Sequence, residues 1–346
     1  MRFSFDSFHQ NLVSVGKTGI FNMHAYHMPT SGSAPLLVQM DRPEPGATQI
    51  QVKIFACGLN FADLLMLNST YQDTPDRPFT LGMEISGVIT AFGDQVSGFA
   101  LGDRVAVFCG QGGLAEWGVF DANRAIKIPD QMSFEQAAAF QITYGTSHIA
   151  LDHCARLQPG ETLLVTGAAG GAGLTAVEIG KQMGARVIAQ ARGADKLAVA
   201  RAAGADHLID ADDDLRTVVK SLGGADVVYD VIGGELWKSA FRATNLGGRL
   251  LPIGFASGDI PQIPANHLLV KNLTVIGFYI GGFLKSHPQV VHSSLVTLLE
   301  WFVEGRLKPH ISHSLPLERV ADGMGLLRSR SSTGKVVITM PAQSTD

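Results

Sequence analysis

A glycine-rich segment offers the clearest chemistry in this sequence. It reads Thr162-Leu-Leu-Val-Thr-Gly-Ala-Ala-Gly-Gly-Ala-Gly173, an apolar strand that turns into an amphipathic helix over Leu174–Met183. Gly170 would let the backbone approach a pyrophosphate, Gly173 would let the helix pack closely on the strand, and the helix N-terminus would offer N–H groups to the anion. The segment predicts a dinucleotide site. The first glycine of the usual pattern is replaced by Ala168, and a plain tight turn is the alternative.

The end of the next strand indicates which dinucleotide would bind. An NAD site places an Asp or Glu there to hold the ribose hydroxyls. This chain has Gln190-Ala191-Arg192-Gly193, with Lys196 following and no acidic residue before Asp195. Arg and Lys form charge-assisted hydrogen bonds with a phosphate. The segment therefore predicts NADPH, and the alternative is that both cations belong to an ordinary solvated helix start.

Three further segments, taken with the glycine turn, resemble a known superfamily. They are Gly58-Leu-Asn-Phe-Ala-Asp-Leu-Leu65, Leu81-Gly-Met-Glu-Ile-Ser-Gly-Val88 and Gly102-Asp-Arg-Val105. Together they resemble the medium-chain dehydrogenase/reductase superfamily, and within it the zinc-independent NADPH:quinone oxidoreductases of the zeta-crystallin-like branch. The similarity extends from Met23 to Met340 in the expected order.

The resemblance implies roles for individual residues. Asn60 would donate an amide hydrogen bond near the reacting carbonyl, and Thr143 would touch the nicotinamide ring, so both are expected to be catalytic. The alternative for Asn60 is a helix N-cap that satisfies the backbone of residues 61–63. The expected substrate pocket contains Leu65, Tyr71, Met83 and Tyr144. Related quinone reductases often carry a Tyr five residues after the Asn, where this chain has Leu65, so other conjugated carbonyls compete with a quinone as substrate.

The remaining cofactor contacts follow from strand ends and from the resemblance. Loops at the carboxyl edge of a parallel sheet should flank the nicotinamide. Arg330 matches an Arg on the adenosine phosphate, and Lys335 matches a cation near the cofactor phosphates; plain surface charge is the alternative for both. The expected cofactor-binding residues are Thr143, Gly167, Ala168, Ala169, Gly170, Gly171, Ala172, Gly173, Ala191, Arg192, Lys196, Ile232, Phe255, Phe278, Tyr279, Arg330 and Lys335.

The same matching argues against a metal ion. Zinc-dependent relatives carry a Cys where Asn60 stands and a Gly-His-Glu where Gly82-Met83-Glu84 stands. An amide oxygen and a thioether are poor zinc ligands beside thiolate and imidazole. The lobe that holds four cysteines in those relatives is absent, because Phe108 runs almost directly into residues 112–117. We therefore expect no metal.

Two domains must position these residues. Short β-branched runs between Gly, Pro and Asp turns predict a small β-barrel, which the resemblance implies is GroES-like. From Pro159 onward, strands alternate with helices, which predicts an α/β, doubly wound Rossmann sheet. The expected division is an N-terminal extension over 1–22, the GroES-like substrate domain over 23–142 and 282–346, and the Rossmann domain over 143–281. The expected parallel strands are Thr162–Thr166, Arg186–Ala191, His207–Ile209, Asp226–Asp230, Gly248–Ile253 and Leu273–Tyr279.

Composition excludes several classes of protein. The chain has 346 residues, 46% of them hydrophobic, and a net charge of −4, so it can fill two cores but offers no basic face to nucleic acid. Its most apolar stretch, residues 268–283, is broken by Lys271, Asn272 and glycines, which argues against a membrane span. Three scattered cysteines fit a reducing compartment, and we expect a cytoplasmic protein.

These observations lead to one principal hypothesis. The protein would be a zinc-independent, NADPH-dependent oxidoreductase that transfers hydride to a small-molecule quinone or α,β-unsaturated carbonyl. An enoyl-thioester reductase and a non-catalytic, cofactor-binding protein of the crystallin type are the alternatives. The charge-free run Leu273–Tyr279 should form the sheet edge in the strand order 3-2-1-4-5-6. That edge predicts a homodimer, unless a helix or loop of the same chain covers it.

Overall fold

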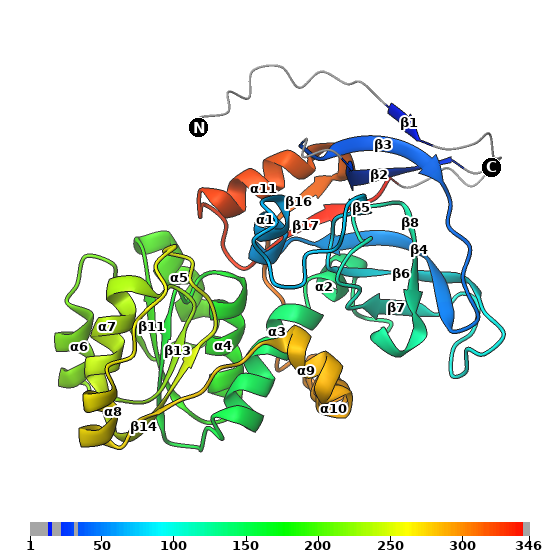
Figure 1. The fold of residues 1–346 in the computed structure, drawn as a ribbon. Helices are drawn as coiled ribbons and strands as arrows, with labels where there is room; N and C mark the ends of the chain where they lie inside the picture. Colours follow the sequence, from blue (N-terminus) through cyan, green and yellow to red (C-terminus); the bar gives the residue numbers. More distant parts are fainter. Residues whose placement is uncertain (1–12, 16–21, 31–33, 342–346) are drawn as a thin grey trace. The chain divides into compact units, whose positions relative to one another are not determined.

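The computed structural model describes residues 13–15, 22–30 and 34–341, and it divides into two compact units (Figure 1). Unit 1 comprises the described residues up to Lys127, with Ser314–Ser329 and the residues from Val337 onward. Unit 2 comprises Ile128–His313 and Arg330–Val336. Most of the extension expected over residues 1–22 lies outside the described residues. Within it, β1 (Val13–Val15) pairs in parallel with β3 (Leu36–Asp41).

Two β-sheets make up most of unit 1. The larger has the order β16-β17-β4-β6-β7-β9, with β8 also on β4, and the smaller has the order β1-β3-β2-β5. The other strands are β2 (Asn22–Met28), β4 (Gln49–Gly58), β5 (Phe79–Thr80), β6 (Glu84–Phe92), β7 (Arg104–Val107), β8 (Trp117–Asp121), β9 (Ala125–Lys127), β16 (Ile311–Pro316) and β17 (Lys335–Thr339). Helix α1 (Phe61–Leu67) begins three residues after β4 ends, and α11 (Val320–Arg328) precedes β17.

A six-stranded parallel sheet forms the centre of unit 2. Its order is β12-β11-β10-β13-β14-β15, which is the expected 3-2-1-4-5-6 arrangement. Its strands are β10 (Thr162–Thr166), β11 (Arg186–Ala191), β12 (His207–Asp210), β13 (Ala225–Asp230), β14 (Thr244–Pro252) and β15 (Thr274–Val275). The helices that connect them are α4 (Gly171–Gln182), α5 (Ala194–Ala202), α6 (Leu215–Ser221), α7 (Gly234–Ala243) and α8 (Ala265–Lys271).

Helices cover both faces of this sheet (Figure 1). On one face, α6 and α7 pack Val219, Trp237 and Phe241 against Leu164 and Val228 of the central strands. On the other face lies α4, where Gly180 allows close approach because a Cβ there would be 2.4 Å from the Leu163 side chain. Apolar residues on consecutive strand positions therefore face opposite helix layers, as a sheet buried on both sides requires.

The last strand is much shorter than expected. We predicted a strand over Leu273–Tyr279, and this is wrong beyond Val275. The Ile276 N–H still donates to the Leu250 carbonyl oxygen at 2.9 Å. The next hydrogen bond of a parallel pair would run from the backbone N–H of residue 252 to the Ile276 carbonyl oxygen. Residue 252 is a proline and has no N–H to donate. The chain instead runs through Phe278 and Tyr279 into α9 (Ile280–Ser286).

The two units divide the chain at positions that differ from those expected. Residues 128–142 and 282–313 belong to unit 2, although the sequence placed them in the GroES-like domain. The long helix α10 (Pro288–Val303) joins unit 2 because it packs on α3 (Gln141–His148). His148 Nδ1 is 2.8 Å from Ser294 Oγ, and its ring contacts Trp301 edge-on. Burial lowers the pKa of His148, as suits a structural histidine.

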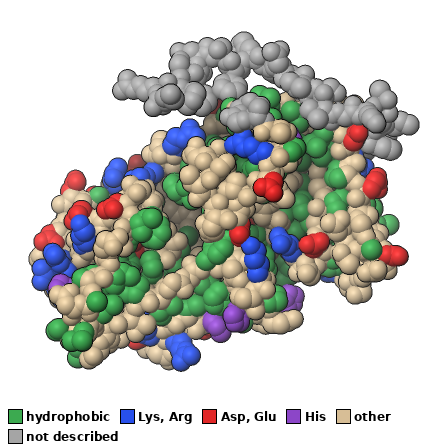
Figure 2. All heavy atoms as spheres, viewed as in Figure 1, with side chains coloured by type: hydrophobic (Ala, Val, Ile, Leu, Met, Phe, Trp, Pro, Cys, Tyr) green, Lys and Arg blue, Asp and Glu red, His purple; other side chains and the backbone are tan. Residues whose placement is uncertain are grey.

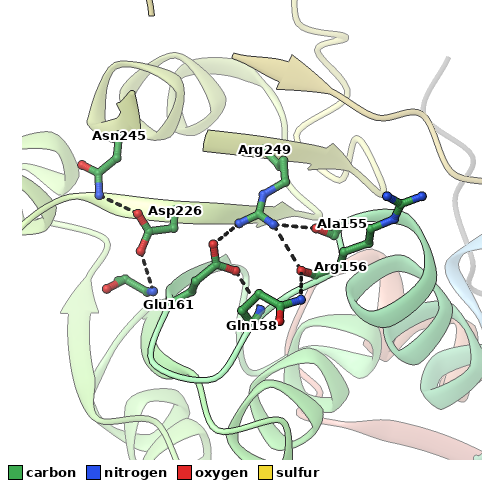
Figure 3. A network of polar contacts seen from close by, with 8 residues as sticks. Ala155, Arg156, Gln158, Glu161, Asp226, Asn245 and Arg249 are labelled. Atoms are coloured by element: carbon green, nitrogen blue, oxygen red, sulfur yellow. Dashed lines mark hydrogen bonds and ion pairs between the residues drawn. The ribbon is translucent and has the colours of Figure 1, made fainter. Parts of the chain in front are cut away.

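A polar network closes the amino-terminal end of the parallel sheet (Figure 3). Arg249 of β14 donates to the Ala155 carbonyl oxygen at 2.7 Å and pairs with the Glu161 carboxylate. Asp226 accepts hydrogen bonds from the Thr162 N–H and the Asn245 amide, both at 2.9 Å. These contacts fasten the strand starts, whereas ligands of doubly wound sheets bind at the carboxyl ends.

Candidate functional site

The glycine turn after β10 has the geometry of a phosphate-binding loop. Gly167 adopts a positive φ of 62°, which glycine tolerates most readily. A Cβ on Gly173 would lie 2.2 Å from the Gly167 carbonyl oxygen, so only glycine lets α4 start this close to the turn. Gly170 occupies the N-cap position of α4, and the N–H groups that follow it have no partner within the helix. The expected turn over Gly167–Gly173 is therefore present.

Two neighbouring segments hold this turn in shape. Gln190, at the end of β11, accepts from the Ala168 N–H through its carbonyl oxygen at 2.9 Å and from the Gly167 N–H through its side chain at 3.2 Å. On the other side, the Gly334 N–H donates to the Ala169 carbonyl oxygen at 2.8 Å. Gly334 also forms a parallel bridge with Gly170. A residue of the distant C-terminal part thus completes the turn.

Thr143 and Lys335 both lie against Gly171. A Cβ on Gly171 would be 3.2 Å from Thr143 Cγ2 and 3.4 Å from Lys335 Cδ. Thr143 Oγ1 donates to the Ala139 carbonyl oxygen at 3.1 Å, while the Thr143 carbonyl accepts from Thr175 Oγ1 at 3.1 Å. The structure therefore brings both expected cofactor residues to the glycine turn, with Thr143 fixed from both its side chain and its backbone.

Three cations gather at the start of α5. Lys196 Nζ donates to the Arg330 carbonyl oxygen at 2.5 Å. The pKa of Lys196 is lowered, first because the side chain is half-buried and then because Arg192 and Arg330 repel its charge. Ala191 is buried at the strand end, where an NAD site would carry an acid. The Asp210 carboxylate approaches this loop and accepts from the Gly193 N–H at 3.1 Å.

Loops at the carboxyl ends of β13 and β14 supply the other expected cofactor residues. Ile232 packs on the turn, because a Cβ on Gly167 would be 2.8 Å from Ile232 Cδ1. Buried Asp230 fixes that loop by accepting from the Gly233 N–H at 2.8 Å and from Thr166 Oγ1. Burial raises the pKa of Asp230, against the effect of these hydrogen bonds. Phe255 is 38% exposed, and Phe278 and Tyr279 are half-buried before α9.

Asn60 lies within unit 1, at the N-cap of α1. Its amide nitrogen donates to the Gly58 carbonyl oxygen at 3.2 Å and to Glu84 Oε1 at 3.0 Å. Its backbone N–H donates to the Asp63 carboxylate at 2.8 Å. Asp63 and Glu84 are fully buried. The geometry therefore agrees with the N-cap alternative, and both amide hydrogens already have acceptors.

Three of the four residues expected around the substrate belong to unit 1, and the fourth belongs to unit 2. Leu65 and Tyr71 are half-buried in unit 1, and Met83 is buried there. Tyr144 belongs to unit 2 and is buried, with its hydroxyl donating to Glu178 Oε2 at 2.5 Å. The Tyr144 ring stacks on Phe140, so it forms part of the interior of unit 2, and its expected place in the substrate pocket stays a prediction.

No group of three or more His, Cys, Asp or Glu side chains among the described residues is arranged to hold a metal ion. Near the positions matched to zinc ligands, Cys109 Sγ lies 3.4 Å from the Gly82 carbonyl oxygen. Burial raises the pKa of this thiol, and the charges of Asp63 and Glu84 raise it further. A thiol in this environment, without a metal ion beside it, stays protonated.

Sequence reasoning missed several residues that shape the cofactor site. Gln190, Asp210 and Asp230 each stand at or next to the last residue of a parallel strand. Polar residues at that edge are candidates in any doubly wound sheet, so this rule could have identified them. Gly334 could not have been found in this way, because its contact with Ala169 joins segments far apart in the sequence.

Comparisons with known proteins agree with this architecture. The sequence matches the alcohol dehydrogenase GroES-like domain family over residues 46–130 and the zinc-binding dehydrogenase family over residues 171–300. The quinone oxidoreductase-like protein 2 homolog of Nematostella vectensis is 44% identical over 300 residues, which is 85% of this chain and 82% of the relative.

Solved structures give the same result. The quinone oxidoreductase from Thermus thermophilus, whose complex with NADPH has also been solved, has a TM-score of 0.81. It is 33% identical, and the match covers 91% of this chain and 99% of that one. The Escherichia coli quinone oxidoreductase complexed with NADPH has a TM-score of 0.84 and 26% identity over 92% and 99% of the two chains.

A Rossmann-type parallel sheet combined with a GroES-like domain defines the oxidoreductases of the medium-chain dehydrogenase/reductase superfamily. This chain belongs to that superfamily, in its quinone oxidoreductase family. In the part of the chain that the structure describes, every helix is too short or too polar to cross a bilayer.

Proposed function

We propose that the protein is an NADPH-dependent reductase that transfers hydride to a quinone or another α,β-unsaturated carbonyl without a metal ion. One observation carries this proposal: within unit 2, an open glycine turn accompanies the cations Arg192, Lys196 and Arg330. The turn suits a pyrophosphate, and cations at the neighbouring strand end suit a 2′-phosphate. The NADPH complexes of the two solved relatives support the same cofactor.

The residues present fit this cofactor. A Cβ on Gly170 would meet nothing closer than the Gly167 carbonyl oxygen at 3.5 Å, so a phosphate can approach the backbone there. Repulsion from Arg192 and Arg330 lowers the pKa of Lys196, and a bound dianion would relieve this repulsion. When bound, NADPH supplies a hydride, and a conjugated acceptor delocalises the incoming electrons onto its oxygen.

The chain's own residues would bind and orient the reactants. The Thr143 hydroxyl gives its hydrogen to Ala139, so its oxygen is available to accept from an amide N–H such as the carboxamide of a nicotinamide. Lys335, beside Gly171, would add positive charge near the phosphates. For Asn60 we propose a positioning role, because donation to a substrate carbonyl would require exchange of its bond to Glu84 or to Gly58.

Zinc independence is part of the proposal. Zinc-dependent relatives use a thiolate and an imidazole at the positions of Asn60 and Met83. The Asn60 amide is bound to Glu84, and a thioether such as that of Met83 is not among the thiolate, imidazole and carboxylate ligands of zinc sites. Orientation and electrostatics would therefore replace Lewis-acid activation of the carbonyl.

The acceptor can be identified by a single screen. Purified protein would be supplied with NADPH and a panel of quinones, enals, enones and acyl-thioesters, and NADPH consumption would be followed. We expect turnover with quinones or with enals and enones. Turnover limited to acyl-thioesters would favour an enoyl-thioester reductase. Tight NADPH binding with no turnover on any acceptor would favour a non-catalytic cofactor-binding protein.

We also propose that the protein is a homodimer joined at the open edge of the parallel sheet. Strand β15 ends the sheet, and α8 beside it in the sequence has no buried residue. Figure 2 shows hydrophobic side chains at the surface around α8. Leu269 and Val270 are 77% and 72% exposed, and Ile260 is 63% exposed. Exposed apolar residues next to a sheet edge favour a partner surface there.

A further inference from the structure

A short piece of the C-terminal region belongs to unit 2, although the residues on both sides of it belong to unit 1. It comprises Arg330–Val336, and we call its first six residues, Arg330–Lys335, the tail strap. The tail strap contacts loops that follow three different parallel strands: the glycine turn after β10, helix α5 after β11 and the loop after β14. In a doubly wound sheet these loops surround the dinucleotide.

One end of the tail strap is fixed on the glycine turn. Besides its hydrogen bond to Ala169, Gly334 forms an antiparallel bridge with Ile311. The Lys335 N–H donates to the His310 carbonyl oxygen at 3.0 Å, and His310 Nε2 lies 2.9 Å from Thr333 Oγ1. A Cβ on Gly334 would be 2.3 Å from the His310 carbonyl oxygen, so any other residue would push the tail strap away from this position.

The other end is fixed among the cations. The Arg330 carbonyl accepts from Lys196 Nζ, and the Arg330 guanidinium donates to the Ala256 carbonyl oxygen. Arg330 has a φ of 56°, a left-handed conformation that costs a non-glycine residue roughly 1 kcal/mol. Such a conformation persists where surrounding contacts enforce it, and it is common at ligand-binding sites.

The two ends cannot move independently. Only three residues lie between Arg330 and Gly334, and a chain extends at most about 3.6 Å per residue. A displacement of Gly334 from the glycine turn must therefore be taken up by three intervening residues or passed on to Arg330. If it reaches Arg330, it also disturbs Lys196, which the Arg330 carbonyl holds in place.

We propose that the tail strap couples the glycine turn to the cation cluster, so that discrimination between NADPH and NADH also depends on residues that do not themselves bind the 2′-phosphate. Thr333 and Gly334 are then positioning residues for cofactor specificity. This inference rests on the proposed function, because it assumes that Arg192, Lys196 and Arg330 bind the 2′-phosphate.

The test compares dissociation constants for NADPH and NADH, measured by fluorescence titration, in the full-length protein and its variants. Gly334→Ala displaces the strap, and we expect the ratio of NADH to NADPH dissociation constants to fall about fivefold or more. Thr333→Val keeps the shape and removes the hydroxyl next to His310, and we expect a fall of about twofold to threefold, as loss of one exposed hydrogen bond suggests. Thr333→Val also provides the result if Gly334→Ala fails to fold.

A matched control separates specificity from stability. Arg249→Ala breaks the network at the opposite end of the sheet and should lower the unfolding temperature without changing the ratio. The inference is overturned if the strap variants weaken both cofactors by the same factor. Equal affinities for the two cofactors in the unmodified protein would overturn the proposed cofactor preference, and the inference with it.

Discussion

The side-chain amide nitrogen of Asn60 lies 3.0 Å from Glu84 Oε1 and 3.2 Å from the Gly58 carbonyl oxygen. An amide carries two N–H hydrogens, so these two acceptors use both. Glu84 is opposite Gly58 in the β4–β6 pair, and Asn60 is the N-cap of α1. The side chain therefore ties the start of a helix to a buried carboxylate at the start of β6.

Replacing this amide with a carboxylate should destabilise the protein. In Asn60→Asp, a new carboxylate would face Glu84 in a buried environment and could not donate to it. We expect a loss of about 2 kcal/mol or more in the free energy of unfolding at neutral pH, because two neighbouring buried carboxylates repel each other and a hydrogen-bond donor is lost. Urea unfolding measures this change.

Asn123→Asp is the control, since Asn123 is exposed in the short 3-10 turn between β8 and β9 of the same unit. Its unfolding free energy should change by less than about 0.5 kcal/mol, as is usual for surface substitutions. Equal effects of the two substitutions would mean that the contact between Asn60 and Glu84 contributes nothing to stability.

Cofactor preference provides a second prediction. We expect NADPH to bind at least tenfold more tightly than NADH, which corresponds to about 1.4 kcal/mol. Lys196→Ala should weaken NADPH about tenfold and NADH less than twofold, because only NADPH carries the 2′-phosphate. Fluorescence titration at fixed ionic strength measures both. A preference for NADH would instead assign Arg192 and Lys196 to the solvated surface.

The parallel sheet could be predicted from sequence because each strand is an apolar run bounded by glycine or a helix signal. Thr162–Thr166 and Arg186–Ala191 were predicted with the observed bounds. The end of β15 could not be predicted from its own residues: Ile276–Tyr279 favours a strand, but its partner position is Pro252, in another segment. Local preference was overridden by a missing hydrogen-bond donor in the neighbouring strand.

The candidate site shows the same division between local and distant information. The glycine turn and Arg192 follow from a contiguous pattern. The resemblance supplied Arg330, but its contact with Lys196 spans 134 residues and depends on how the chain returns to unit 2. The partner of the Tyr144 hydroxyl could not be predicted, because its acceptor, Glu178, lies on another helix and no sequence spacing links the two.

Metal removal provides a third prediction. Prolonged dialysis against a strong chelator should leave the reductase activity unchanged, because no step of the proposed reaction uses a metal ion. Elemental analysis of the purified protein should find well below one zinc per chain. Stoichiometric zinc, or activity that is lost with the chelator and restored by zinc, would show that the matching of Asn60 and Met83 to zinc-ligand positions is wrong.

The pH dependence of stability gives a fourth prediction, centred on Glu178. Burial raises the pKa of Glu178, against hydrogen bonds from Tyr144 and the Lys308 N–H that lower it. A raised folded-state pKa means that the folded protein binds more protons than the unfolded chain above the ordinary value of 4.5. The contribution of this proton binding to the free energy of unfolding is fully present when the pH is below that value. It is lost as the pH rises through the raised pKa of the folded protein.

Glu178→Gln removes this titration and keeps a polar group between Tyr144 and Lys308. The free energy of unfolding of the variant should therefore increase, relative to that of the unmodified protein, as the pH rises from about 4 toward neutrality. Urea unfolding at several pH values measures the difference. A difference that is constant with pH would show that Glu178 has the same pKa in the folded and unfolded chains.

The fifth prediction is that the protein is a homodimer in solution and that charged residues on α8 dissociate it. Because the Ile276 N–H points into the sheet toward Leu250, the alternate N–H of Val275 points toward the open edge. Edge pairing alone would offer few hydrogen bonds over a two-residue strand, so most of the interface must come from apolar area, which α8 exposes at Leu269 and Val270.

Leu269→Lys combined with Val270→Lys should give monomers without loss of folding, since neither side chain is buried. Leu101→Lys, at an exposed leucine of unit 1, is the control and should remain dimeric. Sedimentation velocity measures the mass: a monomeric unmodified protein refutes the dimer, and a dimer that survives the α8 substitutions places the interface elsewhere.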